Sequence, residues 1–137
     1  MSISYSCVVL DEQSRNKLLN VLHDKIPVDW QIIAHHMTIT LGPLMHPANK
    51  YDFIQSGWIP NSKQIIVATH VGRDEKAMAI KVVQPHIISE RITFPHITVA
   101  ISEIGEPSNS NDIPQENFVK LDAPLVLMGV VSEIENK

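Results

Sequence analysis

The sequence predicts an α+β protein built on a mainly antiparallel sheet with few helices. About six or seven segments have the residue pattern of strands, against one or two with the pattern of helices. The 137 residues, of which 44% are hydrophobic and 19% charged, allow one compact domain, residues 1–137, that buries a sizeable core. This composition excludes an intrinsically disordered chain, collagen and a coiled coil.

A strand and a helix open the chain. Residues 2–10 alternate serine with apolar residues, and one face of the predicted strand carries four side chains: Ile3, Tyr5, Cys7 and Val9. Asp11 then has the character of a helix N-cap. Apolar residues recur at helical spacing until Pro27 ends the pattern: Leu18, Leu19, Leu22 and Ile26.

The middle of the chain returns to β-type residues. Residues 30–41 form a predicted strand that ends at a Gly-Pro pair. Residues 44–60 are expected to form a loop, with one short helix near 51–55. Two β-rich runs, 63–71 and 77–83, flank a short polar connection, which indicates a hairpin.

The last third contains two more predicted strands. Residues 85–95 are expected to be irregular or briefly helical, and 97–101 form a strand. Residues 105–117 are a polar loop rich in Pro, Asn and Ser. Residues 125–134 form a final strand, which is expected to be interior because it is apolar on both faces until Ser132.

The charge balance limits the kind of partner. Eleven basic against fifteen acidic side chains give a net charge of -4. Tight binding of long DNA or RNA depends on many Lys or Arg contacts that release counterions, so a long duplex is not the expected partner. A small anionic ligand, held by a few donors, is compatible with this charge.

The single cysteine, Cys7, excludes an intramolecular disulfide and a cysteine-based zinc site. Its apolar neighbours favour a buried small side chain over a reactive thiol. The N-terminal residues lack a basic segment followed by an apolar core, and no apolar run approaches the ~20 residues that span a bilayer. We therefore expect a soluble cytoplasmic protein, in the host cytoplasm if viral, with no membrane partner; its oligomeric state is left open.

Two segments of the chain, 34–40 and 94–100, echo each other. Each has a His two residues before a Thr within an apolar β-type run. The paired residues are His36 and Thr38 in the first segment and His96 and Thr98 in the second. Side chains at positions i and i+2 of a strand share a face. If the two strands pair in one sheet, two imidazoles and two hydroxyls therefore converge on one concavity.

This set of side chains suits phosphodiester cleavage without a metal. The reaction needs one proton removed from the attacking oxygen and one supplied to the leaving oxygen, and histidine can hold either role near neutral pH. The hydroxyls can donate hydrogen bonds to the non-bridging phosphate oxygens as charge develops there. The candidate catalytic residues are therefore His36, Thr38, His96 and Thr98, and the sequence leaves open which His is the acid.

A single motif of this kind is a weak signal. With seven histidines in the chain, about one His-x-Ser/Thr is expected by chance. Two copies are more persuasive, because both lie in a β-type context and their separation fits one half of a duplicated domain. The alternative is a pair of strands whose His and Thr merely line a polar face of the sheet.

The two motifs resemble those of the 2H phosphoesterase superfamily, which is named for two His-x-Thr/Ser motifs. The resemblance covers most of the chain, because the motifs fall in its two halves and the strand-helix opening matches. It implies a bilobal, pseudo-duplicated α+β fold with the motif strands side by side at the floor of a cleft. It also implies catalysis with no metal and no cofactor, in which His36 and His96 form the acid/base pair and Thr38 and Thr98 bind the phosphate.

Members of this superfamily act on different phosphodiesters. Some open 2',3'-cyclic phosphates at RNA ends or on small nucleotides, and some trim or ligate RNA. The chain looks like a compact phage group, the anti-CBASS phosphodiesterases, which destroy the cyclic di- and trinucleotide messengers of bacterial immunity. Its short length and acidic balance favour such a small cyclic nucleotide or cyclic oligonucleotide. The alternatives are a 2',3'-cyclic phosphodiesterase in RNA end processing and a non-catalytic nucleotide-binding module.

Three further residues are candidates for binding the base of the substrate: Tyr5, Trp58 and Glu133. Aromatic stacking is worth about 1–3 kcal/mol per base, although Tyr5 is equally compatible with an ordinary sheet aromatic. Trp58 lies on a predicted loop, where packing explains a large aromatic less readily. Glu133 can accept from a base amine or be a solvated carboxylate at the end of a strand. Arg91 and Lys81 can add charge beside the phosphate, or be simply exposed.

The other histidines do not indicate a metal site. His35 and His36 are adjacent, so an extended strand would direct them to opposite faces. His23 is expected to cap the last turn of the first helix. Three more lack a second ligand at metal spacing: His46, His70 and His86. Residues 105–114 contain no glycine fingerprint for a nucleoside triphosphate.

Overall fold

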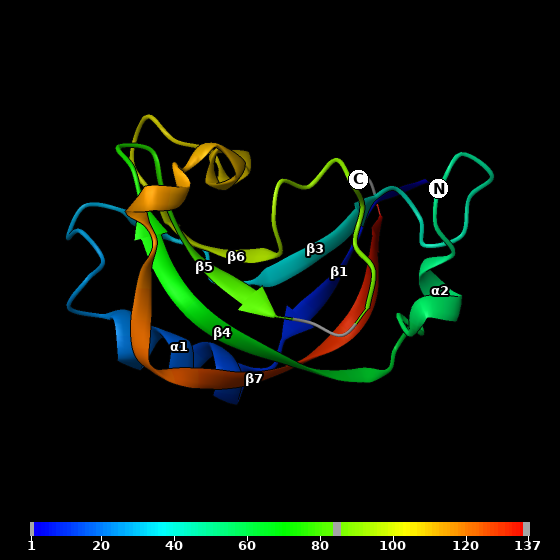
Figure 1. Ribbon diagram of the computed structural model, residues 1–137, viewed down its shortest axis with the longest axis horizontal. Coiled ribbons are helices and arrows are strands. Elements are labelled where there is room, and N and C mark those ends of the chain that lie inside the picture. The colour runs from blue at the N-terminus through cyan, green and yellow to red at the C-terminus, as the bar shows by residue number, and fades with distance from the viewer. Residues whose placement is uncertain (1, 84–85, 136–137) are drawn as a thin grey trace.

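The computed structural model describes residues 2–83 and 86–135 as a curved sheet with short helices at its ends (Figure 1). Its strands are β1 (Ile3–Leu10), β2 (Gln31–Ile32), β3 (His36–Leu41), β4 (Lys63–Arg73), β5 (Ala77–Val83), β6 (His96–Ile101) and β7 (Val119–Glu135). Its helices are α1 (Glu12–Leu22), α2 (Phe53–Ser56) and two 3-10 helices, η1 (Pro107–Asp112) and η2 (Gln115–Asn117). The predicted α+β class, with a mainly antiparallel sheet and few helices, is confirmed. No helix in these ranges is both long enough and apolar enough to cross a membrane.

The sheet closes on itself into a small six-stranded barrel. Its strands follow the order β2-β6-β3-β1-β7-β4-β5, and β5 also pairs with β6. β2 pairs with β6 beside this ring. Each strand of the ring therefore has a neighbour on both sides, which leaves few free sheet edges. The ring brings β3 and β6, the two strands with the His-x-Thr motifs, next to each other.

The predicted hairpin is confirmed. β4 and β5 pair antiparallel, and β4 continues to Arg73, beyond the predicted end at residue 71. Asp74 closes the turn, because its carboxylate accepts hydrogen bonds from the backbone N–H groups of Lys76 at 2.8 Å and Ala77 at 3.0 Å. An aspartate that bonds the backbone two or three residues ahead is a common stabiliser of such turns.

Asp11 caps α1 as predicted, since its side chain accepts a hydrogen bond from Ser14 N at 2.7 Å. The helix ends at Leu22, earlier than predicted, and Ile26 N donates to Leu22 O in the turn that follows. α1 runs alongside β7, where Met128 N donates to Ser14 Oγ at 2.8 Å. The helix thereby satisfies a backbone donor of β7 beyond the end of β1.

β7 lies between β1 and β4, so the final strand is interior as predicted. It extends further than the predicted 125–134. One face contributes to the main core through Leu125, Leu127 and Val131. On the other face, Val126 is 48% and Met128 40% exposed. One apolar face of β7 is therefore buried in the core, and the other is partly exposed to solvent.

Cys7 is fully buried in β1, as predicted for a small apolar side chain. Burial raises the pKa of its thiol to about 12. The protonated thiol is therefore the stable form at neutral pH, and thiolate chemistry is disfavoured.

β3 and β6 pair antiparallel through Met37 and Ile97. The core side of these two strands consists of buried apolar residues: Met37, Ile39, Ile97 and Val99. The motif residues occupy the alternate positions and lie on the opposite face of the sheet. The faces predicted from the two-residue spacing are confirmed.

The strand predicted over 30–41 is divided into β2 and β3 by residues 33–35. Within this break Ala34 has a φ of +40°, a conformation that costs a non-glycine residue on the order of 1–3 kcal/mol. Ala34 is held there because its N–H donates to Thr98 O at 3.0 Å. The break interrupts the extended alternation directly before the first motif.

The polar loop predicted over 105–117 contains η1 and η2. Its Ile113 is buried in a second apolar cluster with residues of the neighbouring strands: Ala77, Ala79 and Ile101. This contact holds the loop against β5 and β6. The loop therefore lies next to the second His-x-Thr motif.

Candidate active site

The motif face of β3 and β6 borders a cavity of about 450 Å³, which we call the His/Thr pocket. Its lining includes six residues singled out from the sequence: Tyr5, His36, Thr38, Arg91, His96 and Thr98. Two loop segments supply further walls, with Arg91 and Ile92 before β6 and Pro107, Ser108 and Asn111 at η1. The volume falls within the ~300–1,000 Å³ typical of ligand pockets. The predicted convergence of the two motifs is confirmed, while the contributions of η1 carried no sequence signal beyond a polar loop.

The register between the two strands orders the four motif residues. Because Met37 faces Ile97 in an antiparallel pair, each motif His lies across from the Thr of the other strand. The two imidazoles then stand on a diagonal of this array, where side chains are typically about 7–8 Å apart. Such a diagonal leaves room for a phosphate between the rings.

His96 has a fixed tautomer. Its Nδ1 lies 2.7 Å from the carbonyl oxygen of Phe94, which can only accept, so Nδ1 carries the proton and Nε2 holds the free lone pair. Burial lowers the pKa of His96, and the hydrogen bond to Phe94 opposes this in part. At neutral pH the ring is therefore uncharged, with Nε2 able to accept a proton.

His36 is held between two aromatic neighbours. Its ring stacks on Tyr5, with centroids 5.0 Å apart and planes 30° apart, and its Nδ1 lies 2.8 Å from Nδ1 of His35. Burial, and then the nearby His35 and His96, lower the pKa of His36 to about 4. A phosphodiester anion in the pocket would favour the protonated form instead.

The expectation that His35 and His36 point to opposite faces is wrong. Their rings meet edge to face, with centroids 5.0 Å apart and planes 82° apart. The positive φ of Ala34 takes His35 out of the extended ladder, so strand alternation does not apply to it. His35 is exposed and His36 is not, so His35 links the ring of His36 to solvent. The adjacency of two histidines was the available signal for this contact.

The two threonines differ in how their hydroxyls are used. Thr98 Oγ1 donates to Pro107 O at 3.1 Å and lies 2.8 Å from Ser110 Oγ. These contacts attach η1 to β6 over the pocket. Thr38 Oγ1 makes no hydrogen bond within residues 2–83 and 86–135, although it lines the pocket. Thr38 can therefore donate a hydrogen bond to a phosphate directly. Thr98 would first have to give up its hydrogen bond to Pro107 O before it could donate to a phosphate.

The interpretation of Trp58 as a stacking platform is wrong. Trp58 comes two residues after the end of α2, and its side chain is 0% exposed. The position of α2 is close to that of the short helix predicted near 51–55. Its Nε1 donates to Ile87 O at 2.6 Å, and its ring meets His86 edge to face. The loop after α2 folds back on the core, so Trp58 joins two distant segments and cannot reach a base.

Glu133, also predicted to contact a base, is an exposed residue near the end of β7. This carboxylate lies outside the His/Thr pocket, where its Oε2 accepts a hydrogen bond from Leu44 N at 3.1 Å. It thus holds the loop that follows β3. Lys81 lies opposite His96 in the register of β5 and β6 but does not line the pocket. Its Nζ lies 4.6 Å from the centroid of the Phe118 ring. Of the two cations considered, only Arg91 lines the pocket.

His23 forms the C-cap of α1, as predicted, with Nδ1 3.0 Å from Asn20 O. Within residues 2–83 and 86–135 no three His, Cys, Asp or Glu side chains are grouped as metal ligands would be. The pocket offers the two imidazoles, the hydroxyls of the two motif threonines and the guanidinium of Arg91, with further polar groups on Tyr5, Ser108 and Asn111.

The low pKa of His36 predicts that stability falls in mild acid. The unfolded chain binds a proton near pH 6.5, while the folded protein binds it only near pH 4. The unfolding free energy should therefore decrease as pH falls from 6.5 to 4, by up to about 3 kcal/mol from this group. Urea unfolding at pH 7 and pH 4.5 measures the decrease. The decrease in unfolding free energy between the two pH values should be smaller in His36→Asn. His23→Gln, at an exposed helix end, controls for the loss of an imidazole. An equal decrease in His36→Asn and the wild type would contradict the low pKa of His36.

No family model matches the chain, and no curated protein matches it. Among solved structures it is similar to a fungal RNA kinase, with 14% sequence identity and a TM-score of 0.60. The match covers 98% of this chain and 46% of that one, so this chain spans about half the length of that protein. At this identity the similarity shows the fold alone. It supports the α+β architecture derived above.

Proposed function

We propose that this protein is a metal-independent phosphodiesterase of the 2H type. Its substrate is a small cyclic nucleotide or a cyclic oligonucleotide messenger, as in the anti-CBASS phosphodiesterases of phages. The observation that carries the proposal is the pairing of β3 with β6, which gives one pocket two imidazoles and two threonines. Paired imidazoles across a phosphate are what in-line cleavage by acid and base requires.

The tautomer of His96 supports its role as the base. Because Nδ1 is committed to Phe94 O, Nε2 can take the proton of a ribose 2'-hydroxyl. The 2'-oxygen then forms a bond to phosphorus, and the bond from phosphorus to the 5'-oxygen breaks. The product is a 2',3'-cyclic phosphate, which water can open by the same pair with the roles reversed.

His36 is then the acid that protonates the leaving 5'-oxygen. It must carry a proton in the complex, although its pKa in the free protein is about 4, and the phosphodiester anion supplies the charge that favours this form. The exposed ring of His35, 2.8 Å from His36 Nδ1, offers a route by which a proton from solvent reaches the site. Thr38 and Thr98 hold the non-bridging oxygens, and Tyr5 packs against the acid.

The second candidate is 2',3'-cyclic phosphodiesterase activity in RNA end processing. The similarity in fold to a fungal RNA kinase favours it, since that protein acts on RNA by its name. The same pair of histidines serves this reaction, because opening a cyclic phosphate is the second half of the scheme above. The net charge of -4 favours a short substrate in either case.

A substrate panel tests the proposal. Cyclic dinucleotides, cyclic trinucleotides, 2',3'-cyclic mononucleotides and an RNA with a 2',3'-cyclic end are compared by kcat/KM in excess EDTA. We expect turnover that EDTA does not lower, with the highest kcat/KM on a cyclic oligonucleotide. The double variant His36→Ala/His96→Ala, purified in parallel, controls for contaminating nucleases. Hydrolysis of none of these compounds, or activity that EDTA abolishes, would contradict the proposal, and preference for the RNA end would favour the second candidate.

A further inference from the structure

A second cavity, of about 270 Å³, adjoins the His/Thr pocket. The two cavities share two lining residues, Leu41 at the end of β3 and Arg91 in the segment before β6. The other walls of the second cavity come mainly from the loop that follows β3, residues 42–51. A ligand that extends from the His/Thr pocket past Arg91 can therefore reach this second cavity.

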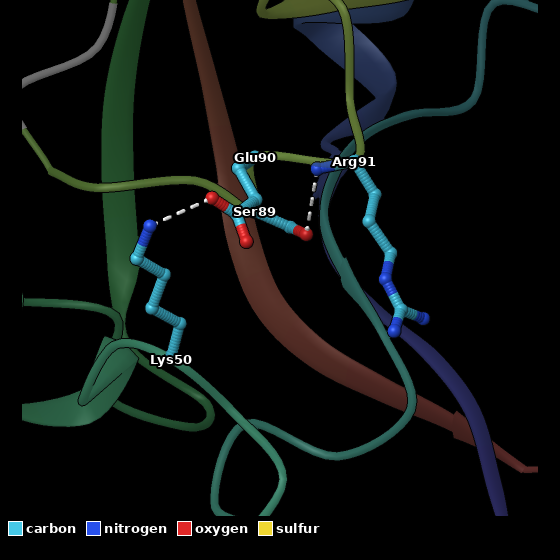
Figure 2. Close-up of polar contacts among 4 residues, drawn as sticks. All are labelled: Lys50, Ser89, Glu90 and Arg91. Atoms are coloured by element: carbon cyan, nitrogen blue, oxygen red, sulfur yellow. Dashed lines mark hydrogen bonds and ion pairs between the residues drawn. The ribbon is translucent and has the colours of Figure 1, made fainter.

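The shared wall is held in place by hydrogen bonds. Ser89 N donates to Ile39 O at 2.8 Å, next along β3 from Thr38. Arg91 N in turn donates to Ser89 Oγ at 3.2 Å (Figure 2). Residues 86–95 contain no helix or strand, yet these bonds fix the position of the Arg91 backbone relative to the motif strand.

Arg91 is the cation left uncompensated at this wall. Lys50, from the loop after β3, pairs with Glu90 at 2.9 Å, with both side chains more than half exposed. Figure 2 shows the Arg91 side chain directed away from this ion pair, and no acidic partner of Arg91 occurs within residues 2–83 and 86–135. A planar guanidinium without a carboxylate partner is suited to bind a phosphate with two hydrogen bonds.

The second cavity has the features of a base site. Tyr51 lines it as a half-buried ring, held edge to face by Phe53 with centroids 6.2 Å apart. His46 Nδ1 accepts from Ala48 N, so in the neutral ring Nε2 is a donor. Asn49 uses its amide nitrogen on two backbone carbonyls, so its carbonyl oxygen is an acceptor. The cavity is smaller than the ~300 Å³ at which pockets for whole drug-sized ligands begin, which fits one planar base.

We propose that this cavity is the subsite for the nucleotide next to the scissile linkage, with Tyr51 stacking on its base and Arg91 binding the phosphate between the two nucleotides. The inference rests on the proposed function and narrows its substrate class. The preferred substrate contains at least one dinucleotide unit, as a cyclic oligonucleotide does and a cyclic mononucleotide does not. A 2',3'-cyclic mononucleotide would occupy the His/Thr pocket alone.

The test compares kcat/KM for a 3',5'-linked cyclic dinucleotide, a linear dinucleotide and a 2',3'-cyclic mononucleotide. Tyr51→Leu should lower the ratio of dinucleotide to mononucleotide kcat/KM by about 5-fold to 150-fold, the range that a lost base stack produces. Tyr51→Phe, which keeps the ring, should restore the ratio. Arg91→Gln should raise KM for the dinucleotides more than it lowers kcat. Arg73→Gln, an exposed arginine outside both cavities, is the matched control and should leave the ratio unchanged.

A binding measurement separates this inference from the proposed function. Calorimetry with the cyclic dinucleotide and His96→Ala, with and without Tyr51→Leu, should show weaker binding when the ring is absent. The subsite is overturned if Tyr51→Leu changes all three kcat/KM values by one common factor, or changes neither kcat/KM nor affinity. If no phosphodiester is cleaved, the proposed function fails, and the calorimetric comparison still decides whether the second cavity binds a nucleotide.

Discussion

Replacing His96 by Ala is expected to lower kcat on the preferred phosphodiester by about 10²-fold to 10⁴-fold, the usual contribution of a positioned acid or base. The reason is the hydrogen bond from Nδ1 to Phe94 O, which keeps Nε2 unprotonated and able to accept the proton of the attacking hydroxyl. His36→Ala should have an effect of similar size. Because acid and base act in one transition state, the double variant should be about as slow as either single variant.

Steady-state rates and substrate affinity must be measured together in these variants. Affinity should change little in His96→Ala, since the imidazole acts mainly on the transition state. His23→Ala, at the exposed end of α1 and outside the His/Thr pocket, is the matched control and should retain full activity. If His96→Ala keeps more than a tenth of the wild-type kcat, the acid/base assignment is wrong. If both single variants lose affinity in proportion to rate, the pocket serves mainly to bind.

Replacing Trp58 by Ala is expected to lower the free energy of unfolding by about 3–5 kcal/mol. The side chain is fully buried, so its removal leaves a large cavity in the core. It also leaves the carbonyl of Ile87 without the indole N–H that donates to it at 2.6 Å. Equilibrium urea unfolding at pH 7 measures the change.

Two further variants make the Trp58 experiment specific. Trp58→Phe keeps an aromatic ring but loses the N–H, so a smaller loss is expected. Trp30→Ala removes the second tryptophan, which is only partly buried, and should cost less than Trp58→Ala. A loss below about 1 kcal/mol in Trp58→Ala, together with weaker nucleotide binding, would return this residue to the base-binding role that its sequence context favoured.

Local patterns predicted much of the secondary structure. The hairpin of β4 and β5 and the Asp11 cap were predicted because turn and cap chemistry depends on residues a few positions apart. The faces of His36 and Thr38 follow in the same way, because alternation is a property of any extended backbone. The closure of the sheet through β5 and β6 was not predicted, since it depends on which strands meet.

The departures from prediction at the site have one physical origin. Trp58 and Glu133 were judged by their local context, as a loop aromatic and a strand-end carboxylate. The structure instead gives each a partner far away in sequence, Ile87 for the indole and Leu44 for the carboxylate. The prediction for His35 was wrong because strand alternation requires an extended backbone, and Ala34 has a φ of +40°. No residue pattern in these segments predicts those contacts.

By itself, the sequence determined that each motif presents a His and a Thr on one side of a strand and that the opposite side is apolar. This follows from the stereochemistry of the extended chain and needs no knowledge of the rest of the molecule. Only the tertiary structure decided that the two motif strands are neighbours, that Phe94 fixes the tautomer of His96, and that Arg91 stands between two cavities. Those features depend on contacts between residues distant in the chain, which the packing of the whole core selects and no short segment encodes.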